Sequence, residues 1–226
     1  MRKIVTLVLL FMLIFKLHGQ QNNLSAEVPF EQLKVVGNIH LVLVPSDVQA
    51  LEFEEAQNLE DVTVKSEDGE LLLKTKSDLS KEPQIKGRLF YTSLHHIEVT
   101  KGAVVQSIDT LKCEILSLKA ETGGKVELRV LTDSISARVN QGADVILYGR
   151  TRTQSVNAYT WGNYLAYGLK VVDTFVKAAT GAQVKVNAAG LLDSNATSKA
   201  TVGYWGEPQQ KKIKTSVGGE VIQLTE

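Results

Sequence analysis

The sequence predicts an all-β fold, a parallel β-solenoid of about seven coils of roughly 20 residues each. Three observations predict it. From Gly102 to the C-terminus a small residue recurs, followed by apolar side chains two and four places later. These apolar positions alternate with polar ones, as in strands, and lack the three-and-four spacing of helices. Pro208 is the only proline of this region, as expected where nearly every amide donates to a neighbouring strand.

Each small residue is expected to mark a corner of one coil. The corner residues are Ala103, Gly124, Ala143, Asn163, Ala182, Ala200 and Gly219. The inward residues two places later, 18 to 21 residues apart, are Val105, Val126, Val145, Leu165, Val184, Val202 and Val221. Small and apolar residues also recur four and six places before each corner. Each coil is therefore predicted to contain two short strands whose alternate side chains fill a narrow interior.

The N-terminus carries the pattern of an export signal. Arg2 and Lys3 precede an apolar run, Ile4 to Phe15, that is too short for a normal membrane-spanning helix. We interpret residues 1–19 as a signal peptide cleaved after Gly19, and residues 20–27 as a polar leader. An uncleaved anchor helix is the alternative. No later apolar run is long enough to span a bilayer, so we expect no transmembrane segment after cleavage.

Residues 28–226 are predicted to form a single β-helix domain, with opening strands and irregular coils in 28–100 and regular repeats in 101–226. Phe30 to Val44 alternates apolar and polar residues, and Val62 to Thr75 has the pattern of a hairpin around the Asp68-Gly69 turn. A β-sandwich also contains many short strands, but its strands need not keep phase over seven repeats.

The charge balance argues against some classes of partner. Without Arg2, Lys3 and Lys16 the chain has 22 basic and 25 acidic residues, a net charge of about −3. Such a surface gives no electrostatic case for nucleic acid or for an anionic membrane. Cys113 is the single cysteine, so no internal disulfide can form.

The corners and the opening strands together resemble a known family. The corners are Lys101-Gly102-Ala103, Thr122-Gly123-Gly124, Gln141-Gly142-Ala143, Thr180-Gly181-Ala182 and Val217-Gly218-Gly219, and the opening segments are Leu33-Lys34-Val35, Gly37-Asn38-Ile39-His40-Leu41 and Asp68-Gly69-Glu70-Leu71. With these motifs, residues 28 to 226 resemble the GIN-domain family of bacterial envelope proteins, labelled "putative autotransporter adhesin head". The resemblance implies a right-handed parallel β-helix, export in a Gram-negative bacterium, and no known catalytic residues. Asn163 and Lys199-Ala200 depart from the pattern.

The sequence gives no catalytic, cofactor-binding or metal-binding residue. His95 and His96 are adjacent in an expected strand and would point to opposite faces, so they cannot easily bind one ion. A polysaccharide-cleaving enzyme would need carboxylates at matching phases of adjacent coils. One place after each corner the only acids are Asp144 and Glu220, four coils apart. Cys113 is interpreted as a buried small side chain.

Aromatic residues supply the candidate contact site. Trp161 and Tyr164 flank the fourth corner at mostly polar phases, so both are expected to face solvent and to stack on a sugar or anchor a partner protein. The alternative is that they cover the apolar edge of a neighbouring coil. Tyr148 and Trp205 occupy matching positions in their coils, near the end of the second strand. The inward phases contain Tyr159, Tyr167 and Tyr204, which are expected in the core.

These features predict an exported, non-catalytic binding module, adhesin-like or part of the cell envelope. It is expected in the periplasm, at the cell surface or outside a Gram-negative bacterium, with a surface glycan or an envelope protein as partner. A polysaccharide-active enzyme and a structural, self-associating protein are the alternatives. Val217 to Leu224 is an apolar final strand with no evident cap, which favours a homo-oligomer formed through terminal coils.

Overall fold

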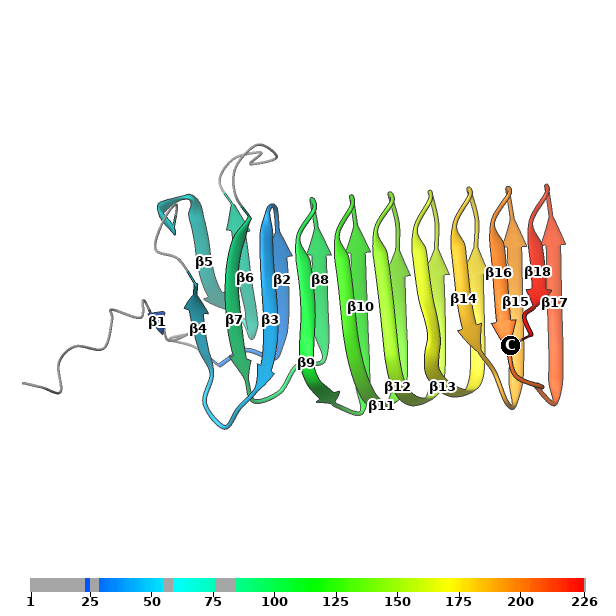
Figure 1. Ribbon diagram of the computed structural model, residues 1–226, viewed down its shortest axis with the longest axis horizontal. Coiled ribbons are helices and arrows are strands. Elements are labelled where there is room, and N and C mark those ends of the chain that lie inside the picture. Colours follow the sequence, from blue (N-terminus) through cyan, green and yellow to red (C-terminus); the bar gives the residue numbers. More distant parts are fainter. Residues whose placement is uncertain (1–22, 25–28, 55–58, 76–83, 226) are drawn as a thin grey trace, which may run out of the picture.

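The computed structural model describes residues 23–24, 29–54, 59–75 and 84–225, and it is a β-solenoid (Figure 1). The predicted signal peptide and most of the predicted leader lie outside these residues. The coils stack along one axis, and parallel strands of successive coils pair in register. Besides strands, the described residues contain one short 3-10 helix, η2 (Leu59–Asp61). The predicted all-β solenoid is confirmed.

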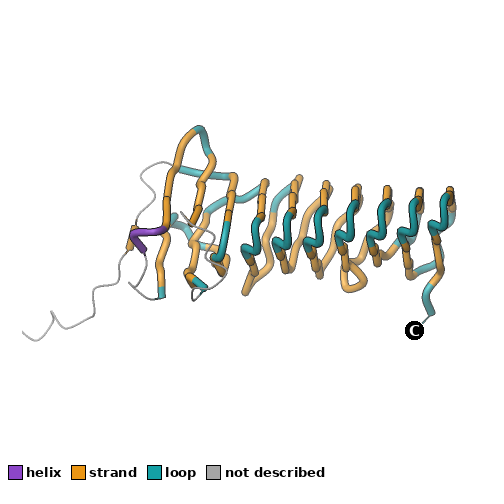
Figure 2. The backbone as a smooth tube through the Cα atoms, turned by 90° about the horizontal axis from the view of Figure 1, so that it is seen from above, coloured by secondary structure: helices purple, strands orange, loops and turns teal. Residues whose placement is uncertain are grey.

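Each regular coil crosses two faces, which we call the front sheet and the back sheet. In stacking order the front sheet contains β4 (Ala50–Phe53), β7 (Ile85–Tyr91), β3 (Ile39–Pro45), β9 (Val104–Lys112), the first parts of β11 (Lys125–Val139), β12 (Asp144–Ala158) and β13 (Asn163–Ala178), then β14 (Gln183–Asn187), β16 (Thr201–Trp205) and β18 (Glu220–Gln223). The back sheet contains β5 (Val62–Glu67), β6 (Glu70–Thr75), β2 (Gln32–Val36), β8 (His96–Thr100), β10 (Ile115–Glu121), the last parts of β11 to β13, then β15 (Leu191–Thr197) and β17 (Gln210–Ser216). Figure 2 shows the loops of successive coils aligned along the solenoid.

The N-terminal coils are stacked out of sequence order. β2 pairs with β6 on one side and with β8 on the other, and β3 pairs with β7 and β9 in the same way. The first coil of the chain therefore lies between two coils that form later in the sequence. The predicted hairpin is confirmed, because β5 and β6 pair antiparallel around Asp68 and Gly69. β1 (Asn23–Leu24) pairs antiparallel with β4 at this end.

The regular coils turn from the back sheet to the front sheet through two successive residues with positive φ. These pairs are Lys101–Gly102, Thr122–Gly123, Gln141–Gly142, Thr160–Trp161, Thr180–Gly181, Ser198–Lys199 and Val217–Gly218. Positive φ costs a residue with a Cβ roughly 1–2 kcal/mol, which explains the frequent glycine. The next residue must be small for another reason. A Cβ on Gly124 would lie 2.5 Å from the carbonyl oxygen of Val99 in the preceding coil.

The fourth corner differs from the prediction by one residue. Asp144 lies opposite Asn163 and Val145 lies opposite Tyr164, so the small corner residue is Gly162 and not Asn163. A Cβ on Gly162 would lie 2.6 Å from the carbonyl oxygen of Val139. Because strand side chains alternate between faces, an offset of one residue reverses every inward and outward assignment in this coil.

The predicted interior column is confirmed, with Tyr164 in the place expected for Leu165. Its members Val105, Val126, Val145, Tyr164, Val184 and Val202 are at most 1% exposed. Val221 continues the column at the C-terminal end and is partly buried against the core. The C-terminal coil has a neighbour on one side only, so every residue of β17 is exposed.

Candidate functional site

A bulge in β13 brings Tyr167 to the outer surface of the front sheet. Ile146 of β12 lies opposite Leu165, but the next opposed pair is Tyr148 and Gly168, so β13 contains one additional residue between these pairs. A bulge of this kind re-aims a side chain. Tyr167 is 49% exposed. The absence of a side chain at Gly168 leaves room for the ring of Tyr148, whose Cδ1 would lie 2.5 Å from an added Cβ.

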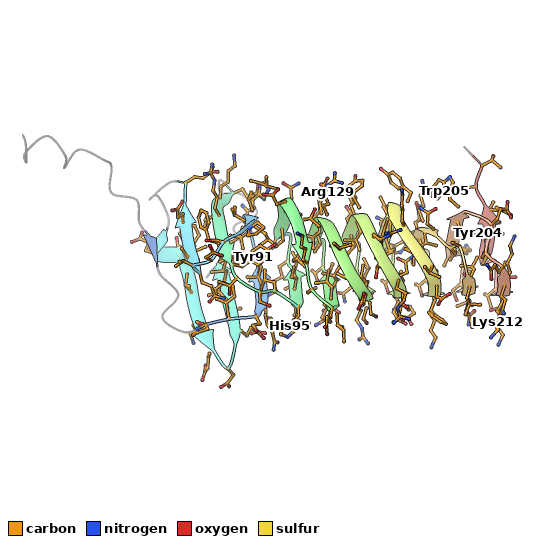
Figure 3. The ribbon with its side chains drawn as sticks, turned by 90° about the horizontal axis from the view of Figure 1, so that it is seen from below. Tyr91, His95, Arg129, Tyr204, Trp205 and Lys212 are labelled. Carbon is orange, nitrogen blue, oxygen red and sulfur yellow. The ribbon has the colours of Figure 1, made fainter. Side chains whose placement is uncertain are left out.

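Three rings, which we call the aromatic row, lie on the front sheet: Tyr148, Tyr167 and Trp205. Tyr148 of β12 and Tyr167 of β13 are on adjacent coils, whereas Trp205 of β16 is two coils beyond Tyr167, past Asn187 of β14. The centroids of Tyr148 and Tyr167 are 6.3 Å apart with ring planes at 84°, and those of Tyr167 and Trp205 are 6.0 Å apart at 53°. Both geometries are favourable for aromatic pairs. Arg129 of β11 lies opposite Tyr148 and extends the row. Figure 3 shows Arg129 and Trp205 on the same side of the molecule.

A cavity of about 690 Å³ adjoins the aromatic row where the front strands of the later coils become shorter. Its walls include the rings of Tyr167 and Trp205 and the polar side chains of Lys170, Asn187 and Glu207. The site therefore combines apolar ring faces with a cation, an amide and a carboxylate, which is a set able to bind a ligand with both C–H faces and hydroxyl groups.

A buried polar network holds the strand beneath the aromatic row. The hydroxyl of Tyr164 donates to Oε1 of Gln154, and Nε2 of Gln154 donates to Oγ1 of Thr174, 3.0 Å away. Thr174 in turn donates to the carbonyl oxygen of Asn187 at 2.6 Å. The side chain of Asn187 points outward and donates from Nδ2 to the carbonyl oxygen of Tyr167 at 2.6 Å. The interior network thus fixes the backbone from which Tyr167 projects.

A second network fixes the loop after Trp205, which forms one wall of the cavity. Nε2 of Gln223 donates to the carbonyl oxygen of Gly206 at 3.0 Å and to Oε1 of Glu207 at 2.9 Å. Nζ of Lys211 donates to Oε1 of Gln223 at 3.3 Å and lies 5.5 Å from the centroid of the Tyr204 ring. Residues of the last coil therefore hold the C-terminal wall of the site.

The Tyr148 hydroxyl interacts with its neighbour in the aromatic row. A hydrogen bond with Tyr167, and then partial burial, raise the pKa of Tyr148 above its ordinary value. A phenol is neutral at physiological pH and can both donate and accept a hydrogen bond.

The structure separates the two residues that the sequence proposed as a contact pair. Trp161 is 66% exposed, as predicted, and has a φ of 61° at the fourth corner. Its ring covers the next corner, since an added Cβ on Gly181 would lie 2.8 Å from Cε3 of Trp161. Tyr164 is fully buried, and its predicted exposure is wrong because the corner is at Gly162.

The same offset affects other aromatic predictions. Tyr167 was expected in the core but is exposed, and Tyr159 lies half-buried on the outer face because Ala158 occupies the inward position. Tyr204 is buried as predicted, at 4% exposure. The shared phase of Tyr148 and Trp205 is visible in the sequence. The position of Tyr167 between them is not visible in the sequence. The glycine that follows it, Gly168, is the signal that could have indicated a bulge there and so the exposure of Tyr167.

The other titratable groups that the structure describes offer no metal site and no activated thiol or phenol. Within the ranges that the structure describes, no group of three or more His, Cys, Asp or Glu side chains could hold a metal ion. Burial raises the pKa of the Cys113 thiol to about 11, and burial raises that of the Tyr91 hydroxyl to about 12. The part of the chain covered by the structure has no helix with the length and hydrophobicity needed to cross a membrane.

A two-sheet solenoid with ordered rings on one long outer face has the architecture of a binding module, since stacked coils create extended surfaces. The chain belongs to the family described as "Putative auto-transporter adhesin, head GIN domain", whose model matches residues 29–208. This family membership assigns it to an adhesin-like class of protein and confirms the resemblance found in the corners and opening strands.

Solved structures have the same fold. A protein from Bacteroides fragilis described as a putative adhesin is 18% identical, with a TM-score of 0.78 over 89% of this chain and 95% of its own. A protein from Parabacteroides distasonis described as a putative lipid binding protein is 14% identical, with a TM-score of 0.68 over 92% and 98%. A putative adhesin from Parabacteroides merdae is 15% identical, with a TM-score of 0.67 over 90% and 95%. No curated protein matches the sequence.

Proposed function

We propose that this protein is an exported, non-catalytic adhesin-like module that binds a surface glycan with its aromatic row. The observation that carries this proposal is the contact of Tyr148 with Tyr167 and of Tyr167 with Trp205 on the front sheet, with centroid distances of 6.3 and 6.0 Å. Family membership supports the adhesin-like role.

The chemistry of the site fits a carbohydrate chain. Aromatic rings bind the C–H faces of sugar rings, and a line of three rings offers a platform longer than one sugar unit. Lys170, Asn187 and Glu207 in the adjoining cavity offer donors and acceptors to hydroxyl groups. The platform needs no closing movement, because the two hydrogen-bond networks described above already fix its backbone.

A glycan array probed with the purified mature protein tests this function. We expect Tyr167→Ala combined with Trp205→Ala to weaken binding of the recognised glycan at least tenfold, because two ring faces are lost. Trp161→Ala is the matched control on the nearby corner. Loss of binding in Trp161→Ala alone would assign the contact to the corner instead. An array without any bound glycan would contradict the glycan proposal and favour an envelope protein as partner.

Export is part of the proposal and rests on the N-terminal pattern of residues 1–19. Cell fractionation of a C-terminally tagged chain should recover it outside the cytoplasm with a shortened N-terminus. Deletion of residues 2–19 should retain it in the cytoplasm. Cytoplasmic recovery of the full chain with its N-terminus intact would refute export.

A further inference from the structure

We propose that the back sheet carries a second binding site, independent of the aromatic row, for an acidic polysaccharide with one carboxylate on every second sugar unit. The site is a line of outward side chains that we call the back-sheet row: Arg138, Asn157, Lys177, Asn195 and Lys214. Cations and amides alternate along it without interruption.

The pairing of the strands places these five residues in one line. Arg138 lies opposite Asn157, Asn157 opposite Lys177, Lys177 opposite Asn195, and Asn195 opposite Lys214. The row therefore crosses five successive coils at right angles to the strands. Figure 3 shows Lys212, a neighbour of this row in β17, on the side of the molecule opposite to Trp205.

The spacing of the cations fits a periodic ligand. Neighbouring strands are roughly 4.8 Å apart, so successive cations, which are two coils apart, repeat at about 9.6 Å. This is close to the length of a disaccharide in an extended polysaccharide. One carboxylate per disaccharide could then meet Arg138, Lys177 and Lys214 in turn, while Asn157 and Asn195 face the intervening sugar.

The cations of the row are available for a ligand. Arg138, Lys177 and Lys214 are exposed, and no acidic side chain of the described residues lies within ion-pair distance of them. One coil before Arg138 on the same line, the cation is already paired. There Lys119 binds Glu98 at 3.3 Å and Glu121 at 3.2 Å, so its charge is already neutralised.

A shallow cavity of about 280 Å³ lies in the middle of the row. Its lining includes Asn157, Lys177, Asn195 and the ring of Phe175, which is 37% exposed. The ring offers an apolar platform for a sugar face, and the amides offer both donors and acceptors to hydroxyl groups. Asp193 also lines the cavity and can accept hydrogen bonds from hydroxyls.

The negative charges in and around the site argue against binding of a densely charged anionic polymer. The carboxylate of Asp193 lies within the site, and the mature chain has a net charge of about −3, so closely spaced phosphates would meet repulsion. A ligand with a carboxylate only every second sugar avoids most of this repulsion and still pairs with each free cation of the row.

Affinity measurements with defined polymers test the proposal. The probes are hyaluronan, which has one carboxylate per disaccharide, carboxyl-reduced hyaluronan with the same backbone, and single-stranded DNA. We expect the mature protein to bind hyaluronan at low ionic strength and to bind the carboxyl-reduced form at least tenfold more weakly. Equal binding of the two hyaluronans, no binding of hyaluronan, or tighter binding of DNA would overturn the proposal.

Variants locate the site. Arg138→Gln, Lys177→Gln and Lys214→Gln together should weaken hyaluronan binding at least tenfold, whereas Lys65→Gln, Lys74→Gln and Arg88→Gln on the N-terminal coils make the same charge change and should have little effect. Equal losses in both triple variants would indicate only a nonspecific charge effect and would overturn the site.

Two further variants separate this site from folding and from the aromatic row. Arg138→Lys, Lys177→Arg and Lys214→Arg together keep the charges and should keep binding, and loss of binding there despite an unchanged thermal transition would contradict the charge argument. Tyr167→Ala with Trp205→Ala should leave hyaluronan binding unchanged. If no glycan on the array binds to the aromatic row, this inference is therefore unaffected. Loss of hyaluronan binding in the Tyr167→Ala, Trp205→Ala variant would refute it.

Discussion

The hydroxyl of Tyr164 donates a hydrogen bond to Oε1 of Gln154 at 2.9 Å, inside the solenoid and away from solvent. Both side chains are fully buried. In a column otherwise formed by valines, this pair introduces polarity into the core, and its hydrogen bonds continue through Thr174 to the strand that supports Tyr167. The interior of the coil and the aromatic row are thus one connected structure.

Removal of this hydroxyl should destabilise the fold. Tyr164→Phe leaves Oε1 of Gln154 without its donor in a buried site, which is expected to cost about 1–3 kcal/mol in free energy of unfolding. Urea denaturation measures the difference. Tyr148→Phe removes a hydroxyl from the surface and should change stability by less than about 0.5 kcal/mol. Equal effects of the two changes would contradict the importance of the buried bond.

Stability should decrease in acid through Glu98. Burial disfavours its ionised form, but the hydrogen bond with Lys34 and the charges of Lys34 and Lys119 outweigh burial, so the pKa of Glu98 lies below its ordinary value. Its ion pairs therefore stabilise the fold above the unfolded-state pKa, and this contribution is lost as pH falls through the folded-state pKa.

Urea midpoints between pH 7 and pH 3 check this effect of Glu98. The wild-type protein should be more stable than Glu98→Gln at pH 7, and the difference should shrink as the carboxylate becomes protonated. Glu114→Gln, at an exposed position, should show a much smaller difference at pH 7. A gap between wild type and Glu98→Gln that does not depend on pH would disprove the assignment.

Cys113 should react slowly with thiol reagents in the folded protein. Burial raises the pKa of its thiol to about 11, so little thiolate is present at pH 8. Labelling by iodoacetamide should be at least tenfold slower in the folded protein than in urea, and it should accelerate as pH rises towards 11. Because the chain has a single cysteine, mass spectrometry gives the rate directly. Equal rates in both states would be inconsistent with this environment.

Association through the C-terminal coils remains a prediction. Ile213 is 44% exposed and Val217 is 76% exposed at the open end of the stack. Lys212 and Lys214 lie in the same strand, so any pairing of two such ends should strengthen with salt, which screens their repulsion.

Light scattering at increasing protein concentration tests this association. Ile213→Lys adds a charge at the open end and should favour the monomer. Ile115→Lys, at a position that is 64% exposed on the back sheet away from this end, should have no effect. A strict monomer at high concentration and high salt would exclude this mode of assembly.

The sequence predicts the regular coils well because one physical requirement repeats in every turn. A small residue must fit against the coil above, and an inward valine must follow two places later. The prediction is wrong in the fourth coil. There Gly162 and Asn163 can each serve as the small corner residue, and the polar residues around them do not distinguish between the two positions. Once the anchor is shifted by one residue, the inward position of Tyr164 follows directly.

Other features depend on contacts that no local pattern records. The position of β2 between β6 and β8 results from pairings between segments far apart in the chain. The aromatic row requires a bulge whose only local sign is Gly168. The alternating back-sheet row is present in the sequence at a spacing of about one coil, but it becomes a line only when the register of the strands is known.

The internal position of the chain's first coil has a consequence for synthesis. A solenoid wound in sequence order could fold turn by turn as each segment leaves the ribosome. Here β2 pairs on one edge with β6 and on the other with β8, and β3 pairs with β7 and then with residues 104–107 of β9, so neither strand has both edges paired until these later segments have been made. The amino-terminal half must therefore assemble as a block, and the remaining coils can then add to it one after another as translation proceeds.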